Sequence, residues 1–150
     1  MKNESKESAK VDRVYIKEDD RKTYSMLKTQ GPLKGLSNKE LFMLALTLGI
    51  KNRHRTPYGS KKPDGFFLLK DLNEKETSLF YAIAISEEKS LDVLTDKNKV
   101  FKIAEEYANC GIHLLKNEVF EKDHLGYIDR LETFLRKEFE RQNTNRSKDL

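Results

Sequence analysis

The chain has little of what stabilises small secreted proteins or anchors membrane proteins. Of its 150 residues, three are proline, one is cysteine and none is tryptophan. The single cysteine, Cys110, excludes an internal disulfide and is typical of a reducing cytoplasm. Apolar runs stay well below the roughly 20 residues that cross a bilayer. Residues 1–10 alternate in charge and lack the apolar segment of a signal peptide. We therefore expect a cytoplasmic protein without a membrane span.

Charged residues are abundant where apolar ones are scarce. Hydrophobic residues make up 37% of the chain and charged residues 36%. This balance predicts a small core under a heavily charged surface. The length favours one domain that folds without disulfides or metals. We expect that domain to span residues 11–142, between disordered polar tails at residues 1–10 and 143–150.

The apolar pattern predicts a mainly α-helical domain of about five helices. The safest prediction is a buried central helix that follows Ser37, because Ser37 and Glu40 match a capping box. A second box, Asn73 with Glu76, opens another helix. Further helices are predicted after Asp19-Asp20 up to Gly31-Pro32, from Thr95 or Asp96 through Leu115, and from Asp123 through Phe139.

Two smaller features complete the predicted fold. Residues 14–16 and 66–69 favour extended structure, and we expect them to pair as a two-stranded β element covered on one face by helices. Gly111 lies inside a helical pattern, where it costs roughly 1 kcal/mol relative to alanine. It should therefore mark either the close approach of another helix or a local break.

The positive charge is concentrated between two apolar segments, in residues 51–62. This segment holds five lysine and arginine residues and no acid. Flexible cationic side chains can meet a phosphate backbone and displace its counterions, and a tyrosine can stack on an unpaired base. The predicted nucleic-acid-binding residues are Lys51, Asn52, Arg53, His54, Arg55, Tyr58, Lys61 and Lys62. The alternative is a loop that is merely solvated.

Other chemistry finds less support in the sequence. Cys110 and His113 share a helical spacing, but a zinc site normally needs four ligands, so we expect a structural pair and a partly buried thiol. Paired acids such as Glu105-Glu106 are explained as helix starts or solvated faces. We expect no metal, no cofactor and no catalytic residue.

Apolar residues continue past Gly111 and along the last predicted helix. Their ordinary explanation is the core of the domain; the alternative is a dimer seam or a docking face for a larger partner. The candidate partner-binding residues are Leu114, Leu115, Val119 and Phe120.

Several of these segments resemble one known family. The order of the capped apolar helix, Gly49-Ile50-Lys51-Asn52, the basic residues up to Pro57, and the later Ala104-Glu105-Glu106-Tyr107-Ala108-Asn109-Cys110-Gly111-Ile112 is similar to small accessory proteins of DNA phosphorothioation (Dnd) systems. The resemblance covers roughly residues 37–140. Arg53 stands where that family suggests glycine. The resemblance implies a setting of sulfur-modified DNA and its defence machinery, and it transfers no catalytic residue.

The sequence thus predicts a non-catalytic accessory protein of a DNA modification or restriction system. It would dock on the DNA backbone through residues 51–62, while its helical body contacts a larger protein of the system. The alternative is a helical protein-interaction subunit or homodimeric adaptor without nucleic-acid contact.

Overall fold

The computed structural model describes residues 11–121 and 124–148, with side chains for 11–120 and 131–146. Its elements in chain order are β1 (Arg13–Lys17), η1 (Glu18–Asp20), α1 (Arg21–Thr29), α2 (Asn38–Lys51), β2 (Pro63–Leu68), η2 (Leu69–Asp71), α3 (Glu74–Glu88), η3 (Leu91–Thr95), α4 (Lys97–Lys116), η4 (Asn117–Glu121) and α5 (His124–Lys148). The mainly α fold with one small β element is confirmed.

The helix boundaries follow side-chain caps that the sequence predicted. The Ser37 hydroxyl accepts a hydrogen bond from the backbone N–H of Glu40 at 3.2 Å. Asn73 and Glu76 form a complete capping box before α3, and Asp96 accepts from the backbone N–H of Lys99 at the start of α4. Each cap satisfies a backbone donor that the first helical turn leaves unpaired.

The predicted strand pair is also present. Strands β1 and β2 form a two-stranded antiparallel sheet with an irregularity between Val14 and Tyr15. Two side chains bond to backbone carbonyls of β2: Arg21 donates to Gly65 at 2.6 Å and Asn38 donates to Phe66 at 3.3 Å. These bonds join β2 to the first residues of α1 and α2.

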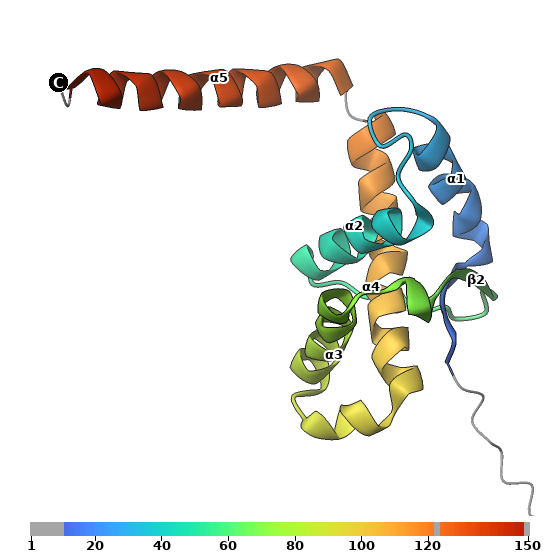
Figure 1. The fold of residues 1–150 in the computed structure, drawn as a ribbon. Helices are drawn as coiled ribbons and strands as arrows, with labels where there is room; N and C mark the ends of the chain where they lie inside the picture. The colour runs from blue at the N-terminus through green and yellow to red at the C-terminus, as the bar shows by residue number, and fades with distance from the viewer. Residues whose placement is uncertain (1–10, 122–123, 149–150) are drawn as a thin grey trace, which may run out of the picture.

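Helices α2 and α4 cross with their backbones in contact (Figure 1). A Cβ atom added to Gly111 would lie 1.6 Å from the carbonyl oxygen of Ala45, and one added to Gly49 would lie 2.0 Å from the carbonyl oxygen of Tyr107. Only glycine leaves room for this approach. Gly111 therefore marks a close helix contact, one of the two outcomes predicted for it, and α4 continues unbroken past it.

Aromatic rings connect the remaining layers of the core. Neighbouring ring centroids lie 4.5–6.4 Å apart. The row runs from α1 through β2 and α2 to α3 and α4, and it consists of Tyr24, Phe66, Phe67, Phe42, Phe80, Phe101 and Tyr81. Aromatic pairs add about 0.5–1.5 kcal/mol each beyond their buried area. They join α1, β2 and α3 to α2 and α4.

The chain ends differ from the prediction in one respect. The tail predicted at residues 1–10 lies outside the described residues, as does the Asp123 cap. Helix α5 continues to Lys148, so residues 143–148 are helical where the sequence predicted a disordered tail. Figure 1 shows α5 leading away from the other helices.

Replacing Gly111 with alanine tests the helix contact. The new methyl group would meet the Ala45 carbonyl, so the helices must separate. We expect the free energy of unfolding to fall by about 3 kcal/mol, measured by urea denaturation. Lys102→Ala, an exposed position on the same helix, is the control and should change it by less than about 0.5 kcal/mol. Equal stability of the two variants would contradict the close crossing.

Candidate functional site

The basic loop, residues 51–62, begins where α2 ends. The Asn52 side chain donates to the Leu48 carbonyl at 2.8 Å, which satisfies one of the last acceptors of the helix. Arg53 then adopts a left-handed backbone conformation with φ of 53°, the region that glycine favours. From there the loop runs along α4, where the backbone N–H of Thr56 donates to the carbonyl of Glu106 at 2.9 Å.

Arg55 attaches the loop to two helices. Its guanidinium lies 2.8 Å from the Glu87 carboxylate on α3 and 3.3 Å from the Glu106 carboxylate on α4. Partial burial acts to lower the pKa of Arg55, but the hydrogen bonds that Arg55 donates to Glu87 and Glu106 and the negative charges of both carboxylates outweigh it and raise that pKa. Because the Glu106 side chain is buried, removing its partner would leave an uncompensated charge. Arg55 is therefore committed to the fold.

Two further predicted binding residues also have acidic partners. Lys61 forms an ion pair with Asp19 at 2.8 Å, and the Tyr58 hydroxyl donates to Glu105 at 2.9 Å. Lys51, Arg53, His54 and Lys62 remain exposed, and none of them forms an ion pair within the described residues. The eight predicted residues thus fall into two groups. The side chains of the held group bond to other parts of the fold: Asn52, Arg55, Tyr58 and Lys61. The open group is exposed: Lys51, Arg53, His54 and Lys62.

A polar seam on α4 receives the loop and the first elements of the chain. It consists of Glu105, Asn109 and His113, which recur at every fourth residue. Glu105 binds Tyr58, Asn109 donates to the Thr56 carbonyl at 3.2 Å, and His113 lies 3.2 Å from the Asp20 carboxylate. The spacing of these three residues in the sequence indicates that they share one face of a helix, but it does not indicate which residues they contact.

Glu105 is the carboxylate of the seam, and burial shifts its pKa. Only 6% of the residue is exposed, and burial raises its pKa to about 7, against the lowering effect of its hydrogen bonds to Tyr58 and the Tyr15 backbone. Burial together with the adjacent Glu105 charge raises the pKa of the Tyr58 hydroxyl. Glu105 can therefore gain or lose a proton near neutral pH.

A second buried acid lies at the far end of the seam. Asp20 is 4% exposed, and the hydrogen bond that His113 makes to it raises the pKa of His113 despite partial burial of the ring. One Asp20 oxygen and the Tyr24 hydroxyl have no hydrogen-bond partner in the described part of the chain. The predicted Cys110 and His113 pair is thus replaced by a contact between His113 and Asp20.

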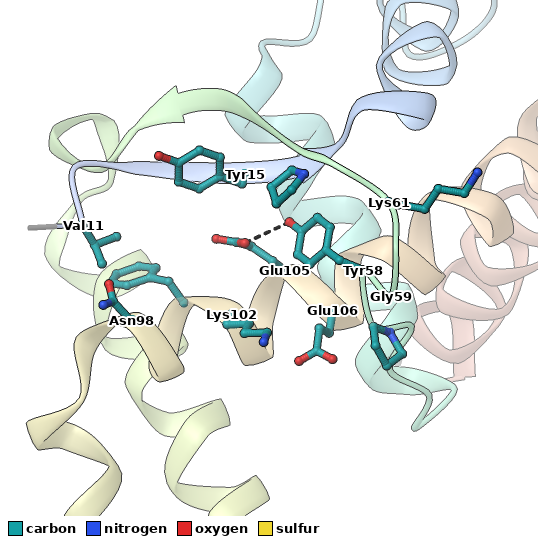
Figure 2. A pocket seen from close by; sticks show the side chains of 12 residues that line it. Val11, Tyr15, Tyr58, Gly59, Lys61, Asn98, Lys102, Glu105 and Glu106 are labelled. Atoms are coloured by element: carbon teal, nitrogen blue, oxygen red, sulfur yellow. Dashed lines mark hydrogen bonds between the residues drawn. The ribbon is translucent and has the colours of Figure 1, made fainter. Parts of the chain in front are cut away.

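An open pocket of about 530 Å³ lies over the Glu105 end of the seam, between β1, the basic loop and α4 (Figure 2). The rings of Tyr15, Tyr58 and Phe101 form part of its wall, and the Glu105 carboxylate points into it. Lys61 and Lys102 also line this pocket. Several of its lining residues come from segments far apart in the sequence, so only the folded chain creates it.

Among the described residues, no group of three or more His, Cys, Asp or Glu side chains lies close enough together to hold a metal ion. Cys110 is a half-buried free thiol, as predicted. No helix in the described ranges is both long and apolar enough to cross a membrane.

The predicted partner residues lie mostly inside the domain. Leu115 and Val119 are buried in the core, whereas Leu114 and Phe120 are half-buried. Exposed apolar side chains lie instead along the described part of α5, where four of them are 47–66% exposed: Leu131, Phe134, Leu135 and Phe139. The apolar spacing of this helix favours packing in the core, but Leu131, Leu135 and Phe139 in its described part are exposed.

The fold and site define a small, mainly α-helical protein with a basic loop held against α4 and a helix α5 whose described part exposes four large apolar side chains. Comparison with known families identifies it further: residues 13–150 match the family described as DNA sulphur modification system-associated protein 4, and the chain belongs to that family. The resemblance to Dnd accessory proteins is therefore confirmed. Neither the curated proteins nor the solved structures contain a match.

Glu105→Gln tests the burial of this carboxylate. The unfolded group ionises near pH 4.5, but the folded group stays protonated up to about pH 7. As pH rises through that window the unfolded chain loses its proton first, so Glu105 makes the folded protein less stable. Relative to wild type, the free energy of unfolding of Glu105→Gln should therefore increase by on the order of 2–3 kcal/mol when the pH is raised from 5 to 8. Urea denaturation at both pH values measures this free energy. The prediction is contradicted if the free energies of unfolding of wild type and Glu105→Gln change equally with pH.

Proposed function

We propose that this protein is a non-catalytic accessory subunit that holds another protein of the DNA sulphur modification system through α5. The observation that carries the proposal is the exposed apolar face of this helix, made of Leu131, Phe134, Leu135 and Phe139. Leu131, Leu135 and Phe139 follow each other at every fourth residue and so lie on one stripe. An amphipathic helix of this kind binds by laying its apolar stripe into a groove of a partner.

The energetics favour an occupant for this stripe. Burying one large apolar side chain contributes about 1.5–3 kcal/mol, so several together offset much of the cost of association. Charges beside the stripe indicate the chemistry of the groove. Arg136 and Arg141 are paired within the helix, with Glu132 and Glu138, while Lys137 and Arg146 form no ion pair in the described residues.

Over residues 131–146 the helix carries four lysine and arginine residues and three glutamates, a net charge of +1. It suits a groove with an apolar floor and an acidic rim. Family membership supplies the setting, since the family is described by its association with a DNA sulphur modification system. The proposed occupant is therefore a protein component of that system.

Leu135→Glu tests the α5 surface. A charge in the centre of the stripe should weaken the complex at least about tenfold, because the groove cannot solvate it. The free energy of unfolding of the protein itself should change little, since Leu135 is exposed. The control is Thr133→Glu, which adds the same charge on the opposite side of the helix. Components of the system are co-expressed one by one with each variant, and the affinity of the captured component is measured by calorimetry.

Two results would contradict this proposal. One is equal binding by Leu135→Glu and Thr133→Glu. The other is a wild-type protein of twice the chain mass in light scattering that becomes monomeric in Leu135→Glu, which would assign the stripe to a second copy.

A second candidate function is docking on the DNA backbone, and the open group of the basic loop favours it. Lys51, Arg53 and Lys62 are exposed cations without an ion pair in the described residues, and His54 lies beside them in the chain. Arg55 and Lys61 would first have to leave their carboxylates. The footprint is therefore about three phosphates, smaller than the sequence suggested.

A salt titration with a labelled DNA duplex tests this docking. Three phosphate contacts give a slope of log affinity against log salt of about −3. Arg53→Ala should reduce the slope by about one unit, whereas Lys75→Ala, an exposed cation on α3, should leave it unchanged. Fluorescence anisotropy measures both. Identical slopes for wild type and Arg53→Ala would remove the DNA contact at this residue.

A further inference from the structure

The pocket over the polar seam combines an acidic interior with a basic rim. Glu105 points into it from α4 and is almost fully buried, while Lys102 and Lys61 stand at its edge (Figure 2). Lys61 is held by Asp19, and Lys102 forms no ion pair within the described residues. Glu106 also lines the pocket, but its carboxylate is engaged by Arg55. Glu105 and Lys102 are thus the charged groups that remain for a guest.

Aromatic rings surround the Glu105 carboxylate. Figure 2 shows it between the rings of Tyr15 and Tyr58, and Phe101 contributes a third ring to the lining. Tyr58 donates its hydroxyl hydrogen to one oxygen of Glu105 and is thereby fixed in place. Each carboxylate oxygen accepts more than one hydrogen bond, so Glu105 retains capacity for donors on a guest.

This arrangement suits a flat guest that carries N–H donors at one end and negative charge at the other. A nucleotide has this form, because the base offers N–H groups and a π-face while the phosphate is anionic. The volume of about 530 Å³ falls within the roughly 300–1,000 Å³ of small-molecule sites. Stacking of a base on an aromatic side chain contributes about 1–3 kcal/mol.

We propose that this pocket receives one unpaired base of a DNA strand, with Glu105 accepting hydrogen bonds from the base and Lys102 facing its phosphate. Guanine is preferred, because its Watson–Crick edge places two N–H donors side by side for a carboxylate, whereas thymine offers one. The proposal rests on the second candidate function, contact with DNA, and extends it from the backbone to a base. It is independent of the α5 surface.

Proton binding gives the site a second signature. Guanine requires the ionised form of Glu105, and the groups that face this carboxylate are Tyr58, the Tyr15 backbone N–H, Glu106 and Lys102. With its pKa raised to about 7, Glu105 becomes ionised between pH 6 and pH 8. The affinity for guanine should therefore increase from pH 6 to pH 8, and the affinity for thymine should depend less on pH.

Titration of the ¹⁵N-labelled full chain with mononucleotides tests the proposal by NMR. Deoxyguanosine monophosphate should shift the amide signals of Tyr15, Tyr58 and Glu105, thymidine monophosphate should shift them less, and deoxyribose phosphate should leave them in place. Glu105→Gln should weaken guanine binding about tenfold, because glutamine has one acceptor oxygen. Lys75→Ala removes an exposed cation of α3 that does not line the pocket and should leave this binding unchanged.

Separate variants distinguish failure of this site from failure of backbone docking. Arg53→Ala should weaken duplex binding and leave mononucleotide binding unchanged, while Glu105→Gln should do the reverse. Equal shifts with deoxyribose phosphate, equal affinity for guanine and thymine nucleotides, or unchanged guanine binding in Glu105→Gln would overturn the base site. Binding of N-acetylarginine amide without nucleotide binding would also overturn it, since the pocket would then accept a cationic side chain.

Discussion

The contact between the backbones of α2 and α4 is the constraint on which the other features depend. Gly49 and Gly111 leave no side-chain atoms between the helices, so the carbonyl oxygens of Tyr107 and Ala45 lie where Cβ atoms would otherwise be. Because α2 ends against the middle of α4, the chain that leaves it must pass along α4. The basic loop is thereby brought to the carboxylates of α4, and the pocket over Glu105 forms beneath it.

This placement gives the charges of the loop two different roles. Arg55 and Lys61 meet carboxylates of the same fold, and ion pairing of a partly buried charge such as Arg55 stabilises the loop rather than a ligand. Lys51, Arg53 and Lys62 face solvent, where cations keep their hydration and remain free to meet phosphate. A run of positive charge in a sequence is therefore an upper limit on the charge that a partner encounters.

Helix α5 shows the same limit for apolar residues. The spacing of Leu131, Leu135 and Phe139 predicted a helix with one apolar stripe, and the helix is present. Periodicity describes only the helix itself, so it predicted the stripe but not what would cover it. In the described residues the stripe is exposed. The reverse holds for Leu115 and Val119, which were candidates for a partner surface and are buried in the core.

Local chemistry explains what the sequence determined by itself. The Ser37, Asn73 and Asp96 caps depend on groups within a few residues, and each is found where it was predicted. The strand pair is also present, but its second strand spans 63–68 instead of the predicted 66–69. The partners of Arg55, the rise in the pKa of Glu105 and the contact between His113 and Asp20 join residues that are far apart in the chain. Only tertiary structure decided these, because ion pairing and desolvation depend on distances in space.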